Sequence, residues 1–233
     1  MSAHPDDAEI GCGGILAKYR SQGFKVGIVD LTDGEPTPYT ASPEERIAES
    51  KESGRTLGLS NRLTLTLPNR RLFDNFESRI ALAKVLRQLR PKLVLSGWGQ
   101  TPLASPDHYQ AQLITESGVF YSRLSKWEEY FDSLAPHRVN SLFYYITLRE
   151  NPLPAVNLVV DITNTFSTKM EALKSYKSQF RANPKQPEGV APWIEAMGRY
   201  YGHLIEKKYG EPLISPKVLE LERIEKLLDG PYV

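Results

Sequence analysis

The stretch Ala3-His4-Pro5-Asp6-Asp7-Ala8-Glu9 places one imidazole and two carboxylates within four residues, where a strand is expected to give way to a helix. One interpretation is a simple helix start, in which Asp6 and Asp7 are acids of the first turn that the helix dipole favours. That interpretation leaves His4 without a role, because a helix start gains nothing from an imidazole. The stretch therefore also has to be considered as part of a binding site.

Outward from this stretch, strand and helix patterns alternate along the chain. Strands are expected at 25–31, 62–67, 91–96, 141–147 and 157–162. Helices are expected after the N-cap Ser42 and at 74–89, 106–122, 165–178 and 190–208. Such alternation indicates βαβ crossovers and a mainly parallel sheet with helices on both faces. The predicted class is α/β, with a mixed edge formed by the later strands and a polar tail after Gly210.

The composition narrows the class of protein. The 233 residues include 29 basic and 28 acidic side chains, for a formal net charge of +1, so no overall field draws the chain to nucleic acid or to an anionic membrane. No apolar run reaches the roughly 20 residues of a membrane-spanning helix. The single cysteine, Cys12, excludes an internal disulfide and fits a cytoplasmic location. Because no repeat or long linker divides the sequence, we expect a single domain over residues 1–233.

A second polar stretch, Ser105-Pro106-Asp107-His108, follows the strand that is expected to end at Ser96. A helix start again explains part of it, with Ser105 as the N-cap, and a lone histidine is usually structural. In a doubly wound sheet of strand order 3-2-1-4, however, the strand before His4 neighbours the strand that ends at Ser96. Ligands bind beyond the carboxyl ends of two such strands, where the connections leave in opposite directions. We therefore expect the two polar stretches to meet there.

His4, Asp7 and His108 together offer two imidazole nitrogens and one carboxylate. This donor set suits a tetrahedral zinc site with an open fourth position, although it also matches the facial triad of non-haem iron oxygenases. Such oxygenases are commonly all-β jelly rolls, whereas helices alternate with strands here. The sequence therefore favours Zn²⁺, with Fe²⁺ or another divalent ion as the alternative, and leaves Asp6 free as a base that activates the attacking water.

The first stretch resembles the signature of the LmbE-like, or PIG-L, family of zinc-dependent de-N-acetylases of N-acetylglucosamine conjugates. The similarity continues through Ile10-Gly11-Cys12-Gly13-Gly14, Asp30-Leu31-Thr32-Asp33-Gly34-Glu35, Leu67-Pro68-Asn69-Arg70, Pro136-His137-Arg138-Val139 and Tyr176-Lys177-Ser178-Gln179-Phe180. Within the family, the chain is most similar to the bacillithiol-pathway deacetylases that act on N-acetylglucosaminyl malate. The resemblance implies a three-layer Rossmann-like fold, a hydrolase that acts on a small amino-sugar conjugate, and a homo-oligomer, either a trimer or a hexamer.

The resemblance also implies roles for individual residues. It gives the same three metal ligands and the same general base as the argument from the residues. It adds Asp107 as the carboxylate that orients an imidazole. Arg46, Arg70 and His137 would contact the substrate, and a guanidinium at position 46 could bind sugar hydroxyls or a carboxylate such as malate. The alternative for Arg46 is an exposed helical side chain that pairs with Glu49.

Two positions depart from the family's pattern. Ser105 stands where the family usually has a histidine that stabilises the tetrahedral oxyanion or helps to protonate the leaving amine. A hydroxyl brings no positive charge, and the loss of one such donor can cost about 2.7–4 kcal/mol in the transition state. Three explanations stay open: the metal suffices, His137 or a tyrosine replaces the histidine, or the reaction is slow. Asn69 replaces a frequent aspartate, which affects the recognition of sugar hydroxyls.

The segment before the first motif is short for this fold. Relatives have a full strand before the alanine, whereas only two residues, Met1 and Ser2, precede Ala3 here. We expect either that the true start lies upstream or that the chain is a fragment. A missing central strand would expose the backbone of its neighbours, and His4 near a fraying end would bind metal more weakly.

Three functions stay open from the sequence. A zinc-dependent N-deacetylase is preferred because Asp6 is intact, and a protein that only binds has no use for a free base. Ser105 and the short first strand favour a catalytically weak or inactive family member that binds a sugar conjugate. An amidase that cleaves a different N-acyl group, from a thiol conjugate, would use the same site.

Overall fold

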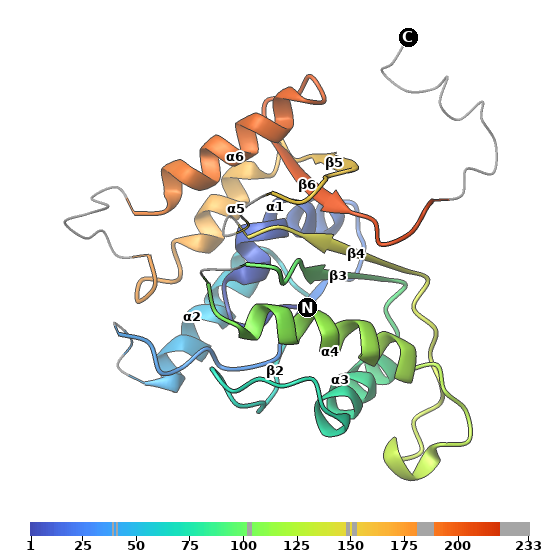
Figure 1. Ribbon diagram of the computed structural model, residues 1–233. Helices are drawn as coiled ribbons and strands as arrows, with labels where there is room; N and C mark the ends of the chain where they lie inside the picture. Colours follow the sequence, from blue (N-terminus) through green and yellow to red (C-terminus); the bar gives the residue numbers. More distant parts are fainter. Residues whose placement is uncertain are drawn as a thin grey trace.

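The computed structural model describes residues 1–38, 40, 42–101, 104–147, 150, 153–180 and 189–219. Its helices are α1 (Asp7–Ser21), α2 (Pro43–Thr56), α3 (Phe76–Leu89), α4 (Asp107–Tyr121), α5 (Phe166–Leu173) and α6 (Ala191–His203), with a 3₁₀ turn at Glu128–Tyr130. Its strands are β1 (Gly27–Asp30), β2 (Asn61–Thr64), β3 (Leu93–Gly97), β4 (Ser141–Tyr145), β5 (Leu158–Asp161) and β6 (Gly210–Ile214). In Figure 1, α4 lies in front of β3 and α1 lies behind it.

The strands pair in the orders β2-β1 and β3-β4-β6-β5. The β1–β2 and β3–β4 pairs are parallel, whereas β6 is antiparallel to both β4 and β5. The prediction of an α/β sheet with a mixed edge is therefore confirmed. The prediction of a polar tail after Gly210 was wrong for residues 211–214, because β6 begins at Gly210 and is buried throughout, and the part of that tail at 220–233 lies outside the described residues. The Gly-Glu-Pro start of β6 carries no strand pattern, and pairing on both sides is what makes it a strand.

Residues 1–3 lie between the two groups of strands. Ser2 forms a parallel bridge with Asp30, and its carbonyl accepts a hydrogen bond from the Leu31 N–H at 2.9 Å. On the other side, the amino group of Met1 donates to the carbonyl of Leu95 in β3 at 2.7 Å. The expected exposure of neighbouring backbone is not found along these residues, and Ser2 and Ala3 are buried. The chain therefore leaves the centre of the sheet at His4, beside the end of β3.

The sheet separates two apolar cores, as a three-layer fold requires. Ile28 in β1 packs with Cys12 and Ile15 of α1 on one face, while the next residue, Val29, packs with Leu82 and Leu86 of α3 on the other. This alternation follows from the twofold period of a strand. Among the described residues, no helix combines the length and the apolar character needed to cross a bilayer.

Helix α2 begins where its capping residues predict. Ser42 accepts a hydrogen bond from the backbone N–H of Glu45 at 3.3 Å, and Pro43 occupies the first turn. The hydroxyl satisfies one of the free N–H groups that every helix start leaves. This cap fixes where α2 begins and, one turn later, where Arg46 lies.

Candidate metal centre

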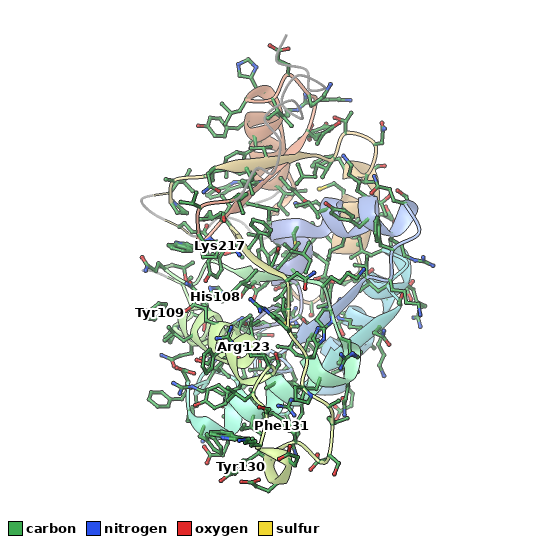
Figure 2. The ribbon with its side chains drawn as sticks, turned by 90° about the vertical axis from the view of Figure 1, so that its right-hand side faces the viewer. His108, Tyr109, Arg123, Tyr130, Phe131 and Lys217 are labelled. Carbon is green, nitrogen blue, oxygen red and sulfur yellow. The ribbon has the colours of Figure 1, made fainter. Side chains whose placement is uncertain are left out.

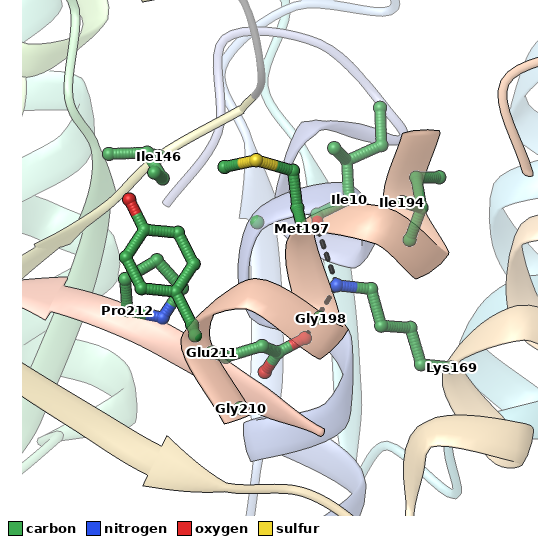
Figure 3. A pocket seen from close by; sticks show the side chains of 11 residues that line it. Ile10, Ile146, Lys169, Ile194, Met197, Gly198, Gly210, Glu211 and Pro212 are labelled. Carbon is green, nitrogen blue, oxygen red and sulfur yellow. Dashed lines mark hydrogen bonds and ion pairs between the residues drawn. The ribbon is translucent and has the colours of Figure 1, made fainter. Parts of the chain in front are cut away.

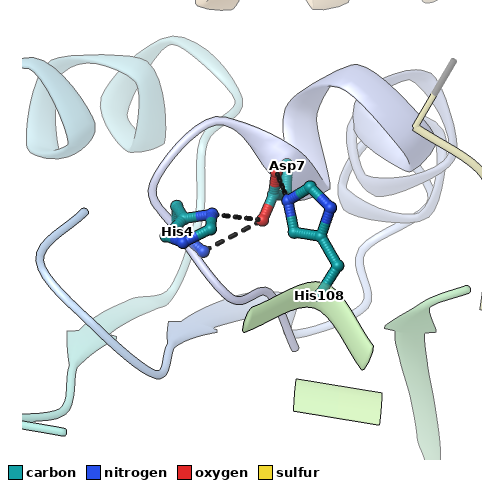
Figure 4. Close-up of side chains that lie close together, drawn as sticks. All are labelled: His4, Asp7 and His108. Carbon is teal, nitrogen blue, oxygen red and sulfur yellow. Dashed lines mark hydrogen bonds and ion pairs between the residues drawn. The ribbon is translucent and has the colours of Figure 1, made fainter. Parts of the chain in front are cut away.

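The structure brings together the two polar stretches. His4 follows the central segment of the sheet, Asp7 opens α1, and His108 lies in the first turn of α4. One ligand atom of each lies within 4.8 Å of the other two. The Asp7 carboxylate lies between the rings, with Oδ2 3.5 Å from His4 Nδ1 and Oδ1 3.4 Å from His108 Nε2. Figure 4 shows the three side chains turned toward one another, as a metal site requires.

The turn before α1 is held in a strained conformation. Asp6 has a φ of 112°, in the left-handed region that costs a residue other than glycine about 1–3 kcal/mol. The backbone N–H of His4 donates to Asp7 Oδ2 at 2.9 Å, which closes the turn. Strain of this kind persists where surrounding contacts enforce it. Here Asp6 contacts Arg46, whereas Asp7 faces the two histidines.

Carboxylates dominate the electrostatics of the cluster. Burial by itself would lower the pKa of His4, but hydrogen bonds to Asp107 and Asp7 outweigh it and raise that pKa to about 10. Burial likewise opposes the charged form of His108, and Asp7 raises its pKa. Burial would raise the pKa of Asp7, but His108 and His4 hold it well below its usual range. The carboxylates that favour the charged form of both imidazoles also favour a divalent cation.

Asp107 lies behind His4. Its Oδ2 is 3.4 Å from His4 Nε2, so Nδ1 is the ring nitrogen that faces Asp7. The same carboxylate accepts the backbone N–H groups of Arg70 at 2.5 Å and Leu72 at 3.3 Å, which fix its position. Arg70 therefore reaches the site through its backbone, while the residue as a whole is exposed.

Thr101 is a site residue that the sequence analysis missed. Its hydroxyl lies 3.1 Å from His108 Nδ1, so Nε2 is the ring nitrogen that faces Asp7. A threonine in a loop carries no motif, and its place shortly after β3, whose end faces the site, was the available signal. Thr101 does for His108 what Asp107 does for His4, because each occupies the nitrogen that points away from the cluster.

Arg46 is buried beside Asp6. Its Nη2 donates to Asp6 Oδ2 at 2.8 Å and to the carbonyl of Pro5. The alternative of an exposed arginine paired with Glu49 was wrong, since Arg46 is 2% exposed and Glu49 accepts hydrogen bonds from Ser178. Burial raises the pKa of Asp6 to about 6, although Arg46 opposes the shift. Within the described part of the chain, Nε and Nη1 of Arg46 have no hydrogen-bond partner.

The structure does not bring His137 to this cluster. Its Nε2 lies 2.8 Å from the carbonyl of Pro91, and its N–H donates to Ser122, just beyond the end of α4. His108 and Ser122 lie about 21 Å apart along the helix, at about 1.5 Å per residue. Figure 2 labels His108, in the first turn of α4, and Arg123, which follows Ser122. His137 of the same chain is therefore too distant to replace the histidine missing at position 105.

Other groups near the cluster are already engaged. The Ser105 hydroxyl accepts the Asp107 N–H at 3.3 Å, as a helix-start residue does. Tyr145 lines a small cavity beside Asp7 and His108, but its hydroxyl donates to the carbonyl of Met1 at 2.9 Å. Asn69 Oδ1 is buried and has no hydrogen-bond partner among the described residues. Arg46 and Asn69 thus both have buried polar atoms without a hydrogen-bond partner among the described residues.

Comparisons with known proteins identify the family of the chain. The chain matches the PIG-L family, described as GlcNAc-PI de-N-acetylase, over residues 1–118. It is 29% identical over 224 residues to the diacetylchitobiose deacetylase of Thermococcus kodakarensis, an alignment that covers 91% of this chain and 79% of that protein. It is 31% identical over 146 residues to a 1D-myo-inositol 2-acetamido-2-deoxy-alpha-D-glucopyranoside deacetylase of Thermomonospora curvata, covering 49% of each.

Solved structures show the same fold. A conserved protein of Thermus thermophilus superposes with a TM-score of 0.82 at 36% identity, over 95% of both chains. The N,N'-diacetylchitobiose deacetylase of Pyrococcus horikoshii gives 0.78 at 28% identity, over 91% of this chain and 80% of that one. A 4-carboxy-2-hydroxymuconate hydratase of Pseudomonas putida gives 0.77 at 19% identity, over 96% and 97%. That last likeness concerns the fold alone, so the chemistry has to be argued from the site.

Proposed function

This chain belongs to the PIG-L family of GlcNAc-PI de-N-acetylases, and we propose that it is a metal-dependent hydrolase that removes the acetyl group from an N-acetylglucosamine conjugate. The observation that carries the proposal is the convergence of His4, Asp7 and His108 within 4.8 Å. Relatives named for deacetylation of diacetylchitobiose and of an inositol glycoside support an acetamido sugar as the substrate class. The malate conjugate stays a prediction from the sequence.

Zn²⁺ fits the donor set, because two imidazoles and one carboxylate leave a fourth position open. When bound, zinc would lower the pKa of a water molecule towards about 7 and polarise the amide carbonyl of the substrate. Fe²⁺ or another divalent ion would use the same donors. His4 would bind through Nδ1 and His108 through Nε2, because Asp107 and Thr101 occupy the opposite nitrogens. Both imidazoles are thus oriented before a metal arrives.

Asp6 is the proposed general base that accepts the proton of the attacking water. It lies next to Asp7 in the sequence, and Arg46 holds one of its carboxylate oxygens. Arg46 is proposed to help bind a hydroxyl or a carboxylate of the substrate; its Nε and Nη1 are buried and have no hydrogen-bond partner among the described residues. Asp107 is proposed to hold His4 in place, and Arg70 to meet the outer part of the substrate. His137 of this chain is left without a proposed role at the site.

The test measures amine release from N,N'-diacetylchitobiose, N-acetylglucosaminyl malate and N-acetylglucosamine with added Zn²⁺. Asp6→Asn should lower kcat by about 10²–10⁴-fold, the usual contribution of a general base, with Zn²⁺ still bound. Asparagine tolerates the left-handed backbone at this position. Asp132→Asn is the matched control, because Asp132 also has a positive φ but pairs with Lys84 at the surface. Amine release that is equal in wild type and Asp6→Asn would contradict the proposed base.

Ser105 favours a second candidate, a family member that binds a sugar conjugate with little or no turnover or that cleaves another N-acyl substrate. Its hydroxyl accepts the Asp107 N–H and can donate only a neutral hydrogen bond, and His137 is too far away to supply an imidazole. Ser105→His should raise kcat by up to about 10²–10³-fold if a missing transition-state donor limits the reaction. Zn²⁺-loaded wild type and Ser105→His that bind the three acetamido sugars without releasing amine would favour the binding role.

Assembly and location are proposed from the sequence. A trimer or hexamer would be measured by sedimentation of the purified chain, and a cytoplasmic location by fractionation of cells. The single domain over residues 1–233 would be tested by limited proteolysis. A stable fragment that retains the metal site would contradict the single domain.

A further inference from the structure

Helix α1 is broken at Cys12, whose φ of −145° and ψ of 20° are not helical. The turn before the break begins with Asp7, and the longer part after it packs on the sheet. In an unbroken α-helix, the N–H of Gly14 would donate to the carbonyl of Ile10, and that of Ile15 to Gly11. At the break, side chains from two other elements take the N–H groups of Gly14 and Ile15 and the carbonyl of Ile10.

Those side chains are Lys169 of α5 and Glu211 of β6. Glu211 accepts the N–H groups of Gly14 at 2.9 Å and Ile15 at 2.7 Å. Lys169 donates to the carbonyl of Ile10 at 2.6 Å and to Glu211 Oε1 at 2.7 Å. Figure 3 shows both contacts of Lys169. In an unbroken helix the Gly14 N–H would donate to the Ile10 carbonyl. Here Glu211 binds that N–H and Lys169 binds that carbonyl, so the buried ion pair replaces the helical hydrogen bond.

The signs of the two charges suit their places. Glu211 lies at the N-terminus of the second part of α1, and Lys169 lies at the carbonyl end of the first turn, so each complements the local helix dipole. A buried ion pair is costly unless further hydrogen bonds satisfy it. Here the additional hydrogen bonds come from backbone groups of α1 that the break leaves without helical partners. The ion pair and the break therefore depend on each other.

The break is coupled to the proposed metal site through one residue. Ile10, whose carbonyl Lys169 holds, donates its own N–H to the carbonyl of Asp6 at 2.9 Å. The rest of α1 has no freedom to compensate, because it lies directly on the sheet. A Cβ at Gly14, after the break, would be 2.7 Å from Ile162 Cδ1, and one at Gly11, the last residue before the break, would be 2.1 Å from Tyr145 Cδ2.

We propose that Lys169 and Glu211 are positioning residues, whose ion pair at the break orients the first turn of α1 so that Asp7 faces His4 and His108. The inference rests on the metal site proposed above. The pair does not touch the ligand atoms and acts through Ile10 and Asp6. Without it, the N–H of Gly14 would close onto Ile10, the helix would straighten, and Asp7 would turn away from the imidazoles.

The experiment uses Co²⁺ as the metal probe on the full chain. Lys169→Met/Glu211→Gln removes both charges together and keeps the side chains near their present size. We expect its Kd for Co²⁺ to rise by about tenfold or more, the range for residues that orient metal ligands, with a changed visible absorption spectrum. Hydrogen exchange at Gly14 and Ile15 should also change. Leu173→Ala is the control, because this buried residue of α5 has no polar group to offer at the break and should leave the Co²⁺ Kd and spectrum unchanged.

A folded double variant with the wild-type Kd and spectrum would overturn the inference, since the pair would then serve stability alone. If the double variant does not fold, Glu211→Gln is measured in the same way. A rise of about threefold would support the inference, and an unchanged Kd would overturn it. Wild type that binds Co²⁺ no better than His108→Ala would overturn the metal site and this inference together. Metal binding without amine release would contradict only the proposed reaction.

Discussion

The two ends of α4 each gather buried polar groups and a histidine, but they do so in opposite ways. At the start, Asp107 and His108 meet His4 and Asp7, and the charged groups face one another. Beyond the end, the charged groups face backbone carbonyls. In Figure 1, α4 runs across the view, so its two ends can be followed there. The start of α4 can therefore bind a ligand, whereas the network beyond its end stabilises the fold.

At the far end of α4, every hydrogen bond of the network ends on the protein's own backbone. Arg87 donates from Nε to the carbonyl of Ser122 at 3.0 Å, from Nη1 to that of Leu134 at 2.7 Å, and from Nη2 to that of Leu124. His137 is bonded to the carbonyl of Pro91. A cation beside the last carbonyls of a helix also complements the helix dipole. Each of the three guanidinium nitrogens of Arg87 donates to a backbone carbonyl, so this network is structural.

At the near end, donors and acceptors are left over. The ligand atoms of His4, Asp7 and His108 converge, and two nitrogens of Arg46 lack a partner among the described residues. A buried histidine is therefore informative only together with the groups that it faces. Substitutions at His108 and His137, and at the residues that contact them, test whether the two ends differ in this way.

The largest effect is expected from His108→Ala. Loss of one of three ligands should raise the Kd for Zn²⁺ by about 10³-fold or more, on the order of 4 kcal/mol, because removing a ligand costs more than removing an outer partner. Competition with a chromophoric chelator measures the affinity. Wild-type affinity in the variant would remove the basis for treating the near end as a metal site.

Arg87→Met should lower the free energy of unfolding by about 3 kcal/mol, because one buried and two partly buried carbonyls lose their donor. For a chain of this size, the melting temperature should fall by about 6–12 °C. Thermal unfolding followed by circular dichroism measures the change. The Zn²⁺ affinity of the folded variant should equal that of wild type, and a fall in affinity would show that the two ends are coupled.

Thr101→Val should raise the Kd for Zn²⁺ by about tenfold, near 1.4 kcal/mol, because His108 loses the hydroxyl that orients its ring. Valine keeps the shape of threonine, so packing is preserved. Thr101→Ser restores a hydroxyl and should recover most of the affinity. Equal weakening in both variants would point to lost packing rather than to orientation of the ring.

The smallest effect is expected from His137→Ala. It should lower the free energy of unfolding by about 1 kcal/mol through loss of the hydrogen bond to Pro91. Chemical denaturation measures this difference, and amine release by the same preparation should match wild type. A large loss of kcat with unchanged stability would show that His137 acts at the substrate site after all.

The sequence predicted most of the elements because their signals are local. Neighbouring residues are enough to predict the cap at Ser42, the alternation of strands with helices, and the helix at 107–121. The match over residues 1–118 confirms the family resemblance. Strand β6 was missed because Gly210 and Pro212 weaken any strand pattern. The break in α1 was missed because it depends on Lys169 and Glu211, which lie more than 150 residues away from it.

For the site, the residues of the two motifs already predict which groups can bind a metal. Motif spacing placed His4 and Asp7 together, and the order of the strands brought His108 to them. The tertiary structure alone decided that Thr101 supports His108, that Arg46 is buried against Asp6, and that His137 belongs to the opposite end of α4. The physical reason is that a residue's type fixes what it can donate or accept, whereas burial and nearby partners fix which of those capacities remain free.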